Sequence, residues 1–383
     1  MVDKCIRITQ VCERWGNGGI EALFMNIFRN IDNDKVRFDI LMAQDKGDKY
    51  DDEIKALGGS KRAFLDNKIK SPMIRVLKNY IAFYKDLKKN KYDIIHFNSY
   101  NGSVYILILL AKLAKVPVRI VHSHNSGMDN SKGKALKLLY HNMCKKLFGN
   151  CATNYFACSE NAAKWLFNKK IVEEKKYVLV KNGIDSRKFV YNLDSRKEIR
   201  KKLQIDDKFV IGNVGRFTEQ KNHEFIIDVF KKVHDKKKNS ILLLIGIGDL
   251  MDKMKEKVKK LGIEDSVYFL GARNEVEKYM QAMDVFLFPS LYEGLGLVAI
   301  EAQAAALKVI ASDYIPKEAN ITNYFEHYPL DDKSVWVNRI LELSNGYERK
   351  DMSDEIIDNG YDIKNVAKLV QDIYISEDNK LNK

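Results

Sequence analysis

The sequence contains few of the residues that mark disordered, secreted or membrane-spanning chains. It has only five prolines and no glycine- or serine-rich tract, which argues against a long disordered linker. The longest purely apolar run is VYILILLA at 104–111, far short of the roughly 20 residues that span a bilayer. The start, MVDKCIRITQV, leads straight into a strand-like segment without the layout of a signal peptide. We therefore expect a cytoplasmic protein.

Cysteine is scarce as well. An odd count of five in a chain of 383 residues indicates reduced thiols rather than a disulfide framework. Three of the cysteines fall seven residues apart, but no zinc-binding pattern has that spacing, so we interpret them as packing residues. The five are Cys5, Cys12, Cys144, Cys151 and Cys158.

Acidic residues are outnumbered in one half of the chain only. Residues 1–180 contain 32 Lys and Arg against 18 Asp and Glu, whereas residues 181–383 contain 33 against 34. The net charge of +13 therefore belongs to the N-terminal half, which should face something anionic. A nucleic acid is a poor candidate, because no recognition motif is present and the aromatic residues are not interleaved with a basic groove.

What the sequence has in abundance is an alternation of strand-like apolar runs and helix-like amphipathic stretches, typical of parallel α/β sheets. The chain is too long for one ordinary domain, and a charged stretch at 186–208 separates two such series. We predict two Rossmann-like, doubly wound parallel-sheet domains that face each other across a cleft, with ligands at the carboxyl ends of the strands. The expected strands are CIRITQV, RFDILMA, KRAFL, DIIHFN, RIVHSH, YFACS and YVLV, followed by FVIGNVG, SILLLIG, VYFLG, VFLFPS and KVIAS.

The first strand leads into a glycine-rich loop, RWGNGGIEALF, ahead of a helix. Gly16, Gly18 and Gly19 would let the backbone approach an anion at the helix N-terminus, although a plain tight turn explains them equally well. A dinucleotide fingerprint needs glycine at position 21, where this chain has Glu21. NAD binding, and with it an oxidoreductase, is therefore disfavoured.

The stretch RIVHSHNSG places His122 and His124 on one face at the carboxyl end of a strand. A zinc site would need a third ligand, and no nearby His, Cys or acidic pair presents itself. We predict no metal site here, and we interpret His124 as an exposed hydrogen-bond donor at the mouth of the strand.

The stretch GNVGRFTEQKNHEFII ends the first strand of the second series and presents Arg216 and Lys221 around a turn into a helix. Two cations beside a helix N-terminus form a site for a diphosphate, where each charge-assisted hydrogen bond is worth roughly 1.5–3 kcal/mol. A solvated surface pair is the alternative. A further strand-to-helix loop contributes Arg273.

The stretch YEGLGLVAIE places two glutamates among glycines and apolar residues, directly after VFLFPSL. Glu293 falls on the loop at the carboxyl end of the expected strand, and Glu301 lies about two turns into the next helix. Gly294 and Gly296 would let backbone N–H groups meet a phosphate or sugar oxygen. The two carboxylates can accept hydrogen bonds from sugar and ribose hydroxyls; the alternative is that each pairs with a local lysine.

In chain order, the motifs GNGGIE, HSHN, NGID, GRFTEQKN and YEGLGLVAIE resemble retaining glycosyltransferases of the GT-B fold, family 4, over nearly the whole chain. The glutamate pair with seven residues between is the most specific element. HSHN and EAQAAALKVIASDYIPKEA look most like the capsular and exopolysaccharide branch of that family. The chain departs from the family pattern at Lys181, Gly296, Leu307 and Lys308, and these departures bear on the choice of sugar.

The resemblance implies a role for each candidate residue. Glu301 would hold the nucleotide ribose, and Glu293 would contact the donor sugar. Arg216 and Lys221 would neutralise the diphosphate, and His124 would lie beside the transferred sugar. His124, Glu293, Arg216 and Lys221 are thus the implied catalytic residues. The implied donor-binding residues are Gly18, Gly19, Arg216, Lys221, Arg273, Glu293, Gly294, Leu295, Gly296, Leu297 and Glu301.

The activity that the resemblance implies is transfer of a hexose from a nucleotide sugar, expected to be a UDP-sugar, to a lipid-linked or polysaccharide acceptor in capsule or exopolysaccharide synthesis. Residues 1–190 would bind the acceptor and residues 205–360 the nucleotide sugar, with a helix in 361–383 packing back onto the N-terminal domain. A sugar-nucleotide epimerase of similar architecture is the alternative, and it would interconvert UDP-sugars without an acceptor.

Neither a cofactor nor a metal ion is expected. Many transferases hold a metal with a D-x-D motif, and the only match, DND at 32–34, falls in an expected surface turn. Arg216 and Lys221 already supply positive potential at the leaving group. We therefore predict metal-independent transfer.

The basic excess of the N-terminal half suits an acceptor at the inner face of the cell membrane, where we expect a peripheral location. Residues 60–91 carry ten Lys and Arg against two Asp, and PMIRVLKNYIAFYKDLKK interleaves cations with apolar residues. Each cation near an anionic surface adds about 1 kcal/mol, and the apolar face could enter the interface. KGKALKLLYHNMCKKLF is a second candidate; the alternative is that both helices pack on their sheet with solvated lysines outside. The expected membrane-facing residues are Arg75, Lys78, Lys85, Lys88 and Lys89.

Overall fold

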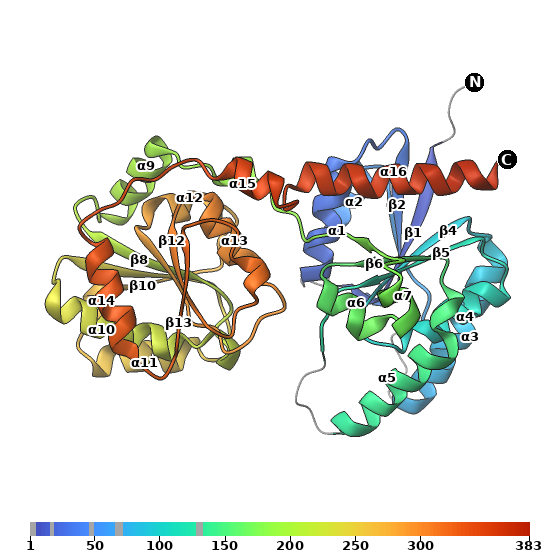
Figure 1. The fold of residues 1–383 in the computed structure, drawn as a ribbon, viewed down its shortest axis with the longest axis horizontal. Coiled ribbons are helices and arrows are strands. Elements are labelled where there is room, and N and C mark those ends of the chain that lie inside the picture. The colour runs from blue at the N-terminus through green and yellow to red at the C-terminus, as the bar shows by residue number, and fades with distance from the viewer. Residues whose placement is uncertain (1–4, 16–18, 46–49, 66–71, 128–132) are drawn as a thin grey trace. The chain divides into compact units, whose positions relative to one another are not determined.

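The computed structural model describes residues 5–15, 19–45, 50–65, 72–127 and 133–383. The chain divides into two compact units, one formed by Met1–Gly183 with Ile363–Lys383 and the other by Ile184–Asp362. We call them the N-terminal unit and the C-terminal unit. Each is a twisted parallel sheet covered by helices (Figure 1). The predicted α/β class with two Rossmann-like domains is confirmed.

The described strands of the N-terminal unit form one seven-stranded sheet in the order β3-β2-β1-β4-β5-β6-β7, with parallel neighbours. The strand order reverses between β1 and β4, which makes that edge the switch point where such sheets bind ligands. The strands are β1 (Ile6–Trp15), β2 (Val36–Asp45), β3 (Ser60–Ala63), β4 (Ile94–Ser99), β5 (Val118–Ser123), β6 (Asn154–Ala157) and β7 (Val178–Leu179). The helices are α1 (Gly19–Asn30), α2 (Asp51–Ala56), α3 (Pro72–Asn90), α4 (Val104–Leu113), α5 (Lys134–Phe148), η1 (Gly149–Cys151), α6 (Glu160–Leu166), α7 (Lys169–Glu173) and α16 (Ile363–Leu381).

The C-terminal unit contains a six-stranded sheet in the order β10-β9-β8-β11-β12-β13. Its strand β9 is buried at every residue, as is typical of a parallel strand covered on both faces. The strands are β8 (Phe209–Val214), β9 (Ser240–Ile245), β10 (Val267–Gly271), β11 (Val285–Phe288), β12 (Lys308–Ser312) and β13 (Phe325–Tyr328). The helices are α8 (Ser186–Phe189), α9 (Leu193–Leu203), η2 (Glu219–Lys221), α10 (His223–Lys236), α11 (Met251–Lys260), η3 (Glu264–Ser266), α12 (Val276–Ala282), α13 (Leu297–Ala304), η4 (Lys317–Ala319), α14 (Lys333–Leu343) and α15 (Ser353–Asp358).

Strand β13 was not predicted from the sequence. It is four residues long, reads FEHY, and pairs with β12 at the edge of the sheet. Only Phe325 is fully buried, because an edge strand can leave most of its side chains in contact with water. Such a short, polar segment lacks the apolar run by which the other strands were recognised.

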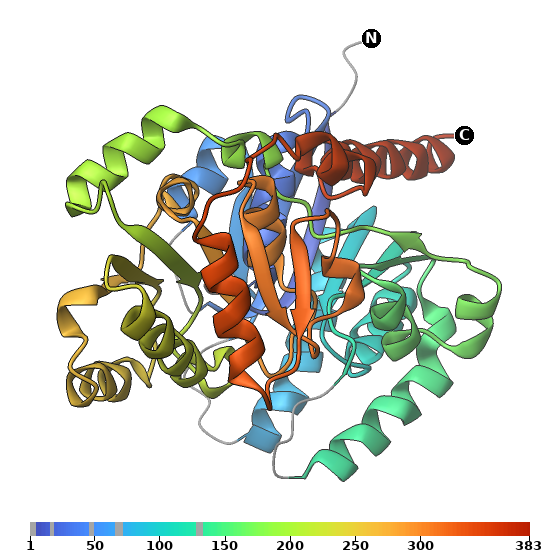
Figure 2. The same ribbon diagram turned by 60° about the vertical axis from the view of Figure 1, so that its left-hand side comes forward.

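The last helix, α16, packs on the N-terminal unit beside α1, β1 and β2. Both ribbon views show it running along this side of the sheet (Figures 1 and 2). Val366, Val370 and Tyr374 are buried in the same apolar core as Phe38. Full burial of an aliphatic side chain of this size contributes about 1.5–3 kcal/mol, so these contacts hold the helix in place.

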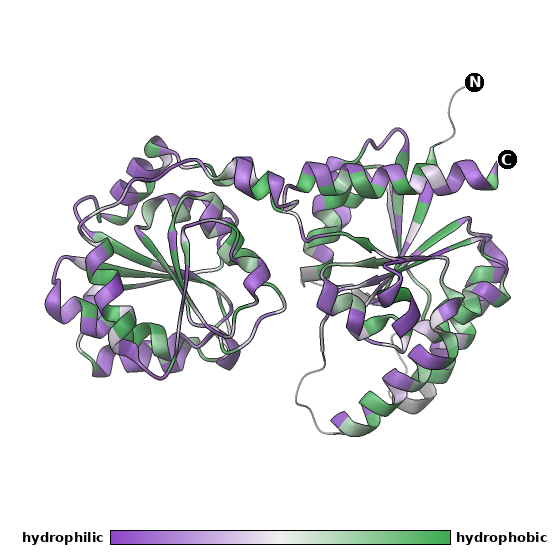
Figure 3. Ribbon diagram, viewed as in Figure 1, coloured by the Kyte–Doolittle hydropathy of each residue, from purple (hydrophilic) through white to green (hydrophobic). Residues whose placement is uncertain are grey.

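Both sheets are hydrophobic along their strands, whereas the helices are hydrophilic on their outer faces over most of their length (Figure 3). Each unit therefore has its own apolar core, as the sequence composition predicts. Among the described residues, none of the helices combines the length and the apolar character that a membrane-spanning segment needs.

Candidate functional site

The loops after β8 and β11 bring together most of the predicted site of the C-terminal unit. The two strands are parallel neighbours, so their carboxyl ends share one edge of the sheet. Arg216 and Lys221 follow β8, while residues 289–296 follow β11 and lead into α13. Two motifs about 80 residues apart in the sequence therefore meet at the edge where parallel sheets bind ligands.

Glu293 and Lys221 form an ion pair between these two loops. Lys221 Nζ lies 2.5 Å from Glu293 Oε1, and the side chains are only 18% and 7% exposed. Gln220 Nε2 also donates to the main-chain oxygen of Tyr292 at 2.9 Å, which ties the loops together. For Glu293, the alternative of a local lysine partner is therefore the one observed. Gln220 was not singled out from the sequence, because its role depends on the approach of the second loop.

Glu301 lies on α13 without such a partner. Among the described residues, its carboxyl group makes no hydrogen bond or ion pair. Burial raises the pKa of this carboxyl to about 7, and the charge of Glu277 adds to the effect. A partly buried carboxyl group with unused acceptor positions is suited to the hydroxyl groups of a ligand.

Gly296 shapes the turn between the two glutamates. Its φ is 88°, in the left-handed region, and it caps the N-terminus of α13. A Cβ atom there would lie 2.8 Å from the ring of Phe288, so glycine is the residue that fits. Gly294 has open space around its Cβ position, and Leu295 and Leu297 pack partly buried against the core. The contribution of these residues to donor binding stays a prediction.

Two arginines extend from the same edge of the sheet. Arg216 follows β8 and Arg273 follows β10, and both are exposed. In the described part of the chain, Arg216 makes no side-chain hydrogen bond or ion pair, and Arg273 lies 5.8 Å from the centroid of the Tyr279 ring. One guanidinium group can donate two parallel hydrogen bonds to phosphate oxygens. The two arginines therefore give this edge positive charge that suits a diphosphate.

The loop after β9 supports the turn that carries Arg216. Gly246 has a φ of 140°, and a Cβ atom on it would lie 2.0 Å from the main-chain oxygen of Gly215. Phe217 N donates to the oxygen of Ile247 at 3.0 Å, so the two loops are in direct main-chain contact. The signal in the sequence was only a pair of glycines after a strand, too common to identify this contact.

In the N-terminal unit, His124 does not have the predicted exposure. It is partly buried, its ring centroid lies 4.0 Å from that of His122, and His122 lies 5.3 Å from His96. Its Nε2 atom is 2.9 Å from Asn98 Oδ1, so the ring is engaged by a neighbouring strand rather than projecting into water. Burial lowers the pKa of His124 to about 3, which keeps the imidazole neutral.

No metal cluster was found among the residues that the structure describes. The His96, His122 and His124 rings lie next to one another, tilted by 34° and 37° from ring to ring. Gly19 is the first residue of α1, at the carboxyl end of β1. Gly18, the other loop residue predicted to approach the donor, lies outside the described residues. The roles of both glycines stay predictions.

Helices α3 and α5 approach each other at Tyr80 and Tyr140, and both carry exposed apolar side chains. Tyr80 Oη and Tyr140 Oη are 3.4 Å apart, which places the helices in contact. Phe83 and Leu87 of α3 and Cys144 of α5 face the core, yet seven large apolar side chains on the two helices are 46–72% exposed. We call this surface the apolar patch; it comprises Val76, Leu77, Ile81, Leu136, Leu139, Met143 and Leu147.

The predicted cations lie along the same helices. Lys78, Lys85, Lys88 and Lys89 are exposed on α3, while the side chain of Arg75 lies outside the described part of the structure. Both helices pack on the sheet with lysines outside, as the simple alternative has it, and they also turn the apolar patch outward. The membrane-facing role of these cations stays a prediction.

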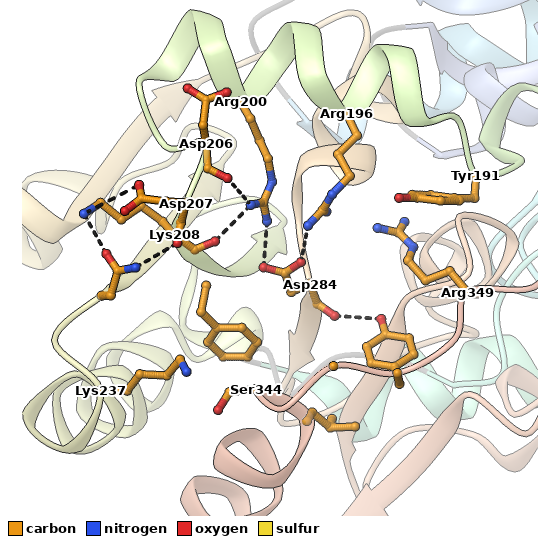
Figure 4. Close-up of a pocket in the computed structure, with 15 residues that line it drawn as sticks. Tyr191, Arg196, Arg200, Asp206, Asp207, Lys208, Lys237, Asp284, Ser344 and Arg349 are labelled. Atoms are coloured by element: carbon orange, nitrogen blue, oxygen red, sulfur yellow. Dashed lines mark hydrogen bonds and ion pairs between the residues drawn. The ribbon is translucent and has the colours of Figure 1, made fainter.

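A cavity of about 490 Å³ opens at the amino ends of the strands of the C-terminal unit, away from Glu293. In Figure 4, the guanidinium groups of Arg196 and Arg200 point at Asp284, with nitrogen–oxygen distances of 2.5 and 2.7 Å. Arg349 donates to main-chain oxygens between α12 and β11. These donors stabilise the turn before β11, so we assign the cluster a structural role.

Comparison with known proteins identifies the family. Residues 195–362 match the family model described as glycosyl transferases group 1, and residues 17–188 match glycosyltransferase family 4. EpsF of Bacillus subtilis (strain 168), which is named as a glycosyltransferase, is 31% identical over 98% of each chain. An Escherichia coli protein named UDP-Gal:alpha-D-GlcNAc-diphosphoundecaprenol alpha-1,3-galactosyltransferase is 28% identical over 93% of each chain.

Solved structures show the same fold. Anabaena Alr3699/HepE in complex with UDP is similar with a TM-score of 0.71 and 16% identity, over 98% of each chain. These matches do not favour the alternative of a sugar-nucleotide epimerase. The chain therefore belongs to the GT-B glycosyltransferases, with a family 4 domain followed by a group 1 domain.

Proposed function

We propose that this glycosyltransferase moves a hexose from a UDP-sugar, with retention of configuration, to a lipid-linked or polysaccharide acceptor in capsule or exopolysaccharide synthesis. The name of the E. coli relative supports a UDP-sugar donor and a diphosphate-linked lipid acceptor. The UDP complex of the Anabaena protein supports the same nucleotide. The motifs HSHN and EAQAAALKVIASDYIPKEA support the capsular and exopolysaccharide branch.

The observation that carries this proposal is the unpartnered carboxyl group of Glu301. A partly buried carboxyl group costs free energy unless hydrogen-bond donors reach it. Two adjacent hydroxyls, such as those of a ribose, would donate to both of its oxygens at once. Glu301 would then hold the nucleoside, and the N-terminus of its helix α13 would lie beside the phosphates.

The leaving group in such a transfer is a nucleoside diphosphate. Arg216 and Arg273 would bind its oxygens, and Lys221 has two N–H groups beyond the one directed at Glu293. Positive charge placed in advance at the leaving oxygen lowers the barrier without reorganisation. In other transferases a metal ion neutralises the leaving diphosphate. These cations would do so here, so we propose metal-independent transfer.

Glu293 is held by Lys221, and we propose that it positions the donor sugar through its second oxygen. We propose that His124, in the N-terminal unit, meets a sugar hydroxyl. Retention requires the acceptor to attack from the face that the phosphate leaves. The departing phosphate oxygen would then take the acceptor's proton, since it gains negative charge as the bond breaks.

The experiment for this proposal measures nucleotide release from UDP- and GDP-hexoses, with a lipid extract as acceptor and a chelator present. Release from one UDP-hexose is expected, and Glu301→Ala should lower kcat/KM for the donor roughly 10- to 100-fold, since hydrogen bonds to a charged group are worth about 1.5–3 kcal/mol. Glu256→Ala is the matched control, because Glu256 is exposed on α11 in the same unit. The anomeric configuration of the product, read by NMR, tests retention.

Three results would contradict the proposal at different points. Loss of turnover in the chelator would refute metal independence. Interconversion of UDP-sugars without an acceptor would restore the epimerase alternative. Equal activity of the Glu301→Ala variant would remove the assigned role of the carboxyl group.

We further propose that the apolar patch and its lysines dock on an anionic lipid surface. The exposed leucines of the two helices suit the apolar interior of a lipid layer. The lysines beside them suit its anionic headgroups. Residues 1–180 contain more cations than carboxylates, so their net positive charge is opposite to the charge of an anionic lipid surface. This location would bring the enzyme to a lipid-linked acceptor.

Co-sedimentation with vesicles tests this surface. Binding to vesicles that contain phosphatidylglycerol should exceed binding to neutral phosphatidylcholine and should fall with salt. The variant Leu136→Ser/Leu139→Ser should weaken binding, whereas Leu193→Ser, an exposed leucine of the C-terminal unit, should not. Binding that ignores lipid charge and salt would refute the proposal.

A further inference from the structure

A continuous row of hydrogen bonds connects His124 with the last helix of the chain. His124 Nε2 lies 2.9 Å from Asn98 Oδ1, and Asn98 Nδ2 lies 2.9 Å from Gln10 Oε1. Gln10 Nε2 lies 3.0 Å from Tyr374 Oη, which in turn lies 2.6 Å from His96 Nδ1. The row crosses β5, β4 and β1 and ends on α16, and its members line one small cavity within the N-terminal unit.

Each group in this row donates its hydrogen bond toward His96. The amide nitrogen of Asn98 donates to Gln10, and the amide nitrogen of Gln10 donates to the hydroxyl oxygen of Tyr374. The hydroxyl has one proton, so it donates that proton to His96 Nδ1. At the other end, the amide oxygen of Asn98 can only accept, so His124 donates through Nε2.

We propose that Tyr374, Gln10 and Asn98 lock His124 in the tautomer with its proton on Nε2, so that Nδ1 is a hydrogen-bond acceptor. The three are positioning residues. That Nδ1 then accepts a hydrogen bond from a hydroxyl of the donor sugar rests on the function proposed above. His124 is thus assigned as an acceptor toward its ligand, the reverse of the donor role predicted from the sequence.

A lock of this kind matters because the imidazole is neutral. Burial keeps the pKa of His124 well below neutrality, so the ring has a single proton that must sit on one nitrogen or the other. A hydroxyl can donate to Nδ1 only when the proton is on Nε2. The His122 ring, whose centroid lies 4.0 Å away at an interplanar angle of 37°, restricts rotation of the His124 ring, and the bond to Asn98 selects which ring nitrogen holds the proton.

The row also gives a role to the buried hydroxyl group of Tyr374. Tyr374 is fully buried, and its ring contacts those of Phe38 and His96. Its hydroxyl oxygen is the acceptor for Gln10 Nε2, while its proton is directed at His96 Nδ1. Without that hydroxyl, Gln10 Nε2 would lose its acceptor, and rotation of both amides by 180° would reverse the proton order of the row.

The test reads the tautomer directly, by the ¹⁵N chemical shifts of histidine side chains in the full-length protein at pH 7. The His124 signal is identified by its loss in His124→Asn. The wild-type protein should show a neutral ring with its proton on Nε2. Tyr374→Phe should show both tautomers. The matched control is Tyr105→Phe, which removes the hydroxyl of another fully buried tyrosine in the same unit, one bonded only to the oxygen of Leu166.

Kinetics give a second measurement. If the two tautomers become equally populated, half of the enzyme can bind the donor, so KM for the donor should rise about twofold while kcat is unchanged. Tyr105→Phe should change neither constant, even where it lowers thermal stability as much as Tyr374→Phe.

The variant Asn98→Asp provides a rescue. An ionised carboxylate can only accept, so it keeps the proton on Nε2 whatever the orientation of Gln10. Adding Tyr374→Phe to Asn98→Asp should therefore leave the tautomer unchanged. A wild-type His124 with its proton on Nδ1, or an unchanged tautomer in Tyr374→Phe alone, would overturn the proposed lock. A tautomer change without a change in KM would refute only the sugar contact of His124.

Discussion

The carboxyl group of Glu301 should make the protein less stable as the pH rises from 4.5 toward neutrality. Because burial raises its pKa from 4.5 to about 7, the folded state favours the protonated carboxyl. The sign follows from proton binding: between these two values the folded chain holds a proton that the unfolded chain has released. Stability therefore falls as the pH rises from 4.5 to 7 and is constant above.

The variant Glu301→Gln removes this titration while keeping the shape of the side chain. A shift of one pKa unit corresponds to about 1.4 kcal/mol, so the difference between 4.5 and 7 sets an upper bound of about 3 kcal/mol. Partial exposure of the group reduces this value, and we expect about 1–2 kcal/mol. The variant should be more stable than the wild type above pH 7 and equal to it below pH 4.5.

The assay is urea unfolding of the full chain between pH 4.5 and 8.5, followed by circular dichroism. Glu256→Gln provides the control, since this exposed glutamate of the same unit should give a difference that does not change with pH. A Glu301→Gln variant that is less stable than the wild type at pH 8 would refute the reasoning. It would mean that the ionised carboxylate has a partner in the folded protein.

Three more outcomes follow from the same site. At pH 7 the carboxyl of Glu301 is about half protonated, and ribose hydroxyls would stabilise its ionised form, so UDP binding should release about half a proton. Calorimetry in buffers of different ionisation enthalpy measures this release, and proton uptake would contradict the prediction. Lys221→Met should cost about 3 kcal/mol by leaving Glu293 without its cation, and Lys221→Met/Glu293→Gln should recover most of it in thermal unfolding without recovering nucleotide release. Gly296→Ala should cost about 1–2 kcal/mol from its positive φ, and more from contact with Phe288; an unchanged melting temperature would contradict the geometry.

The fold could be predicted from the sequence because parallel strands that are buried on both faces leave continuous apolar runs. SILLLI of β9 and VFLF of β11 are such runs, and both lie in the sheet where they were expected. The edge strand β13 could not be found in this way, because its four residues, FEHY, form no apolar run. The other edge strand, β10, is buried to a similar extent but reads VYFLG, which is apolar enough to be predicted.

The candidate site was predicted as a set of residues, and its internal pairing was not. Glycine-bounded turns at strand ends placed Arg216, Lys221, Glu293 and Glu301 on one edge, since the carboxyl ends of parallel strands share it. Which glutamate meets Lys221 depends on the path of two loops, and residue types alone do not distinguish Glu293 from Glu301. The exposure of His124 was wrong for the same kind of reason, because Asn98 reaches it from another strand.

The sequence by itself determined two parallel sheets, the edge of each that carries the polar motifs, and the sign of the charge on the N-terminal half. These properties follow from local patterns of apolar, glycine and charged residues. Only the tertiary structure decided that Glu293 is paired while Glu301 is not, and that leucines of α3 and α5 face outward. It also decided that Tyr374, 364 residues from Gln10, completes the row that ends at His124. Such contacts depend on distances between atoms far apart in the chain, and no local pattern encodes those distances.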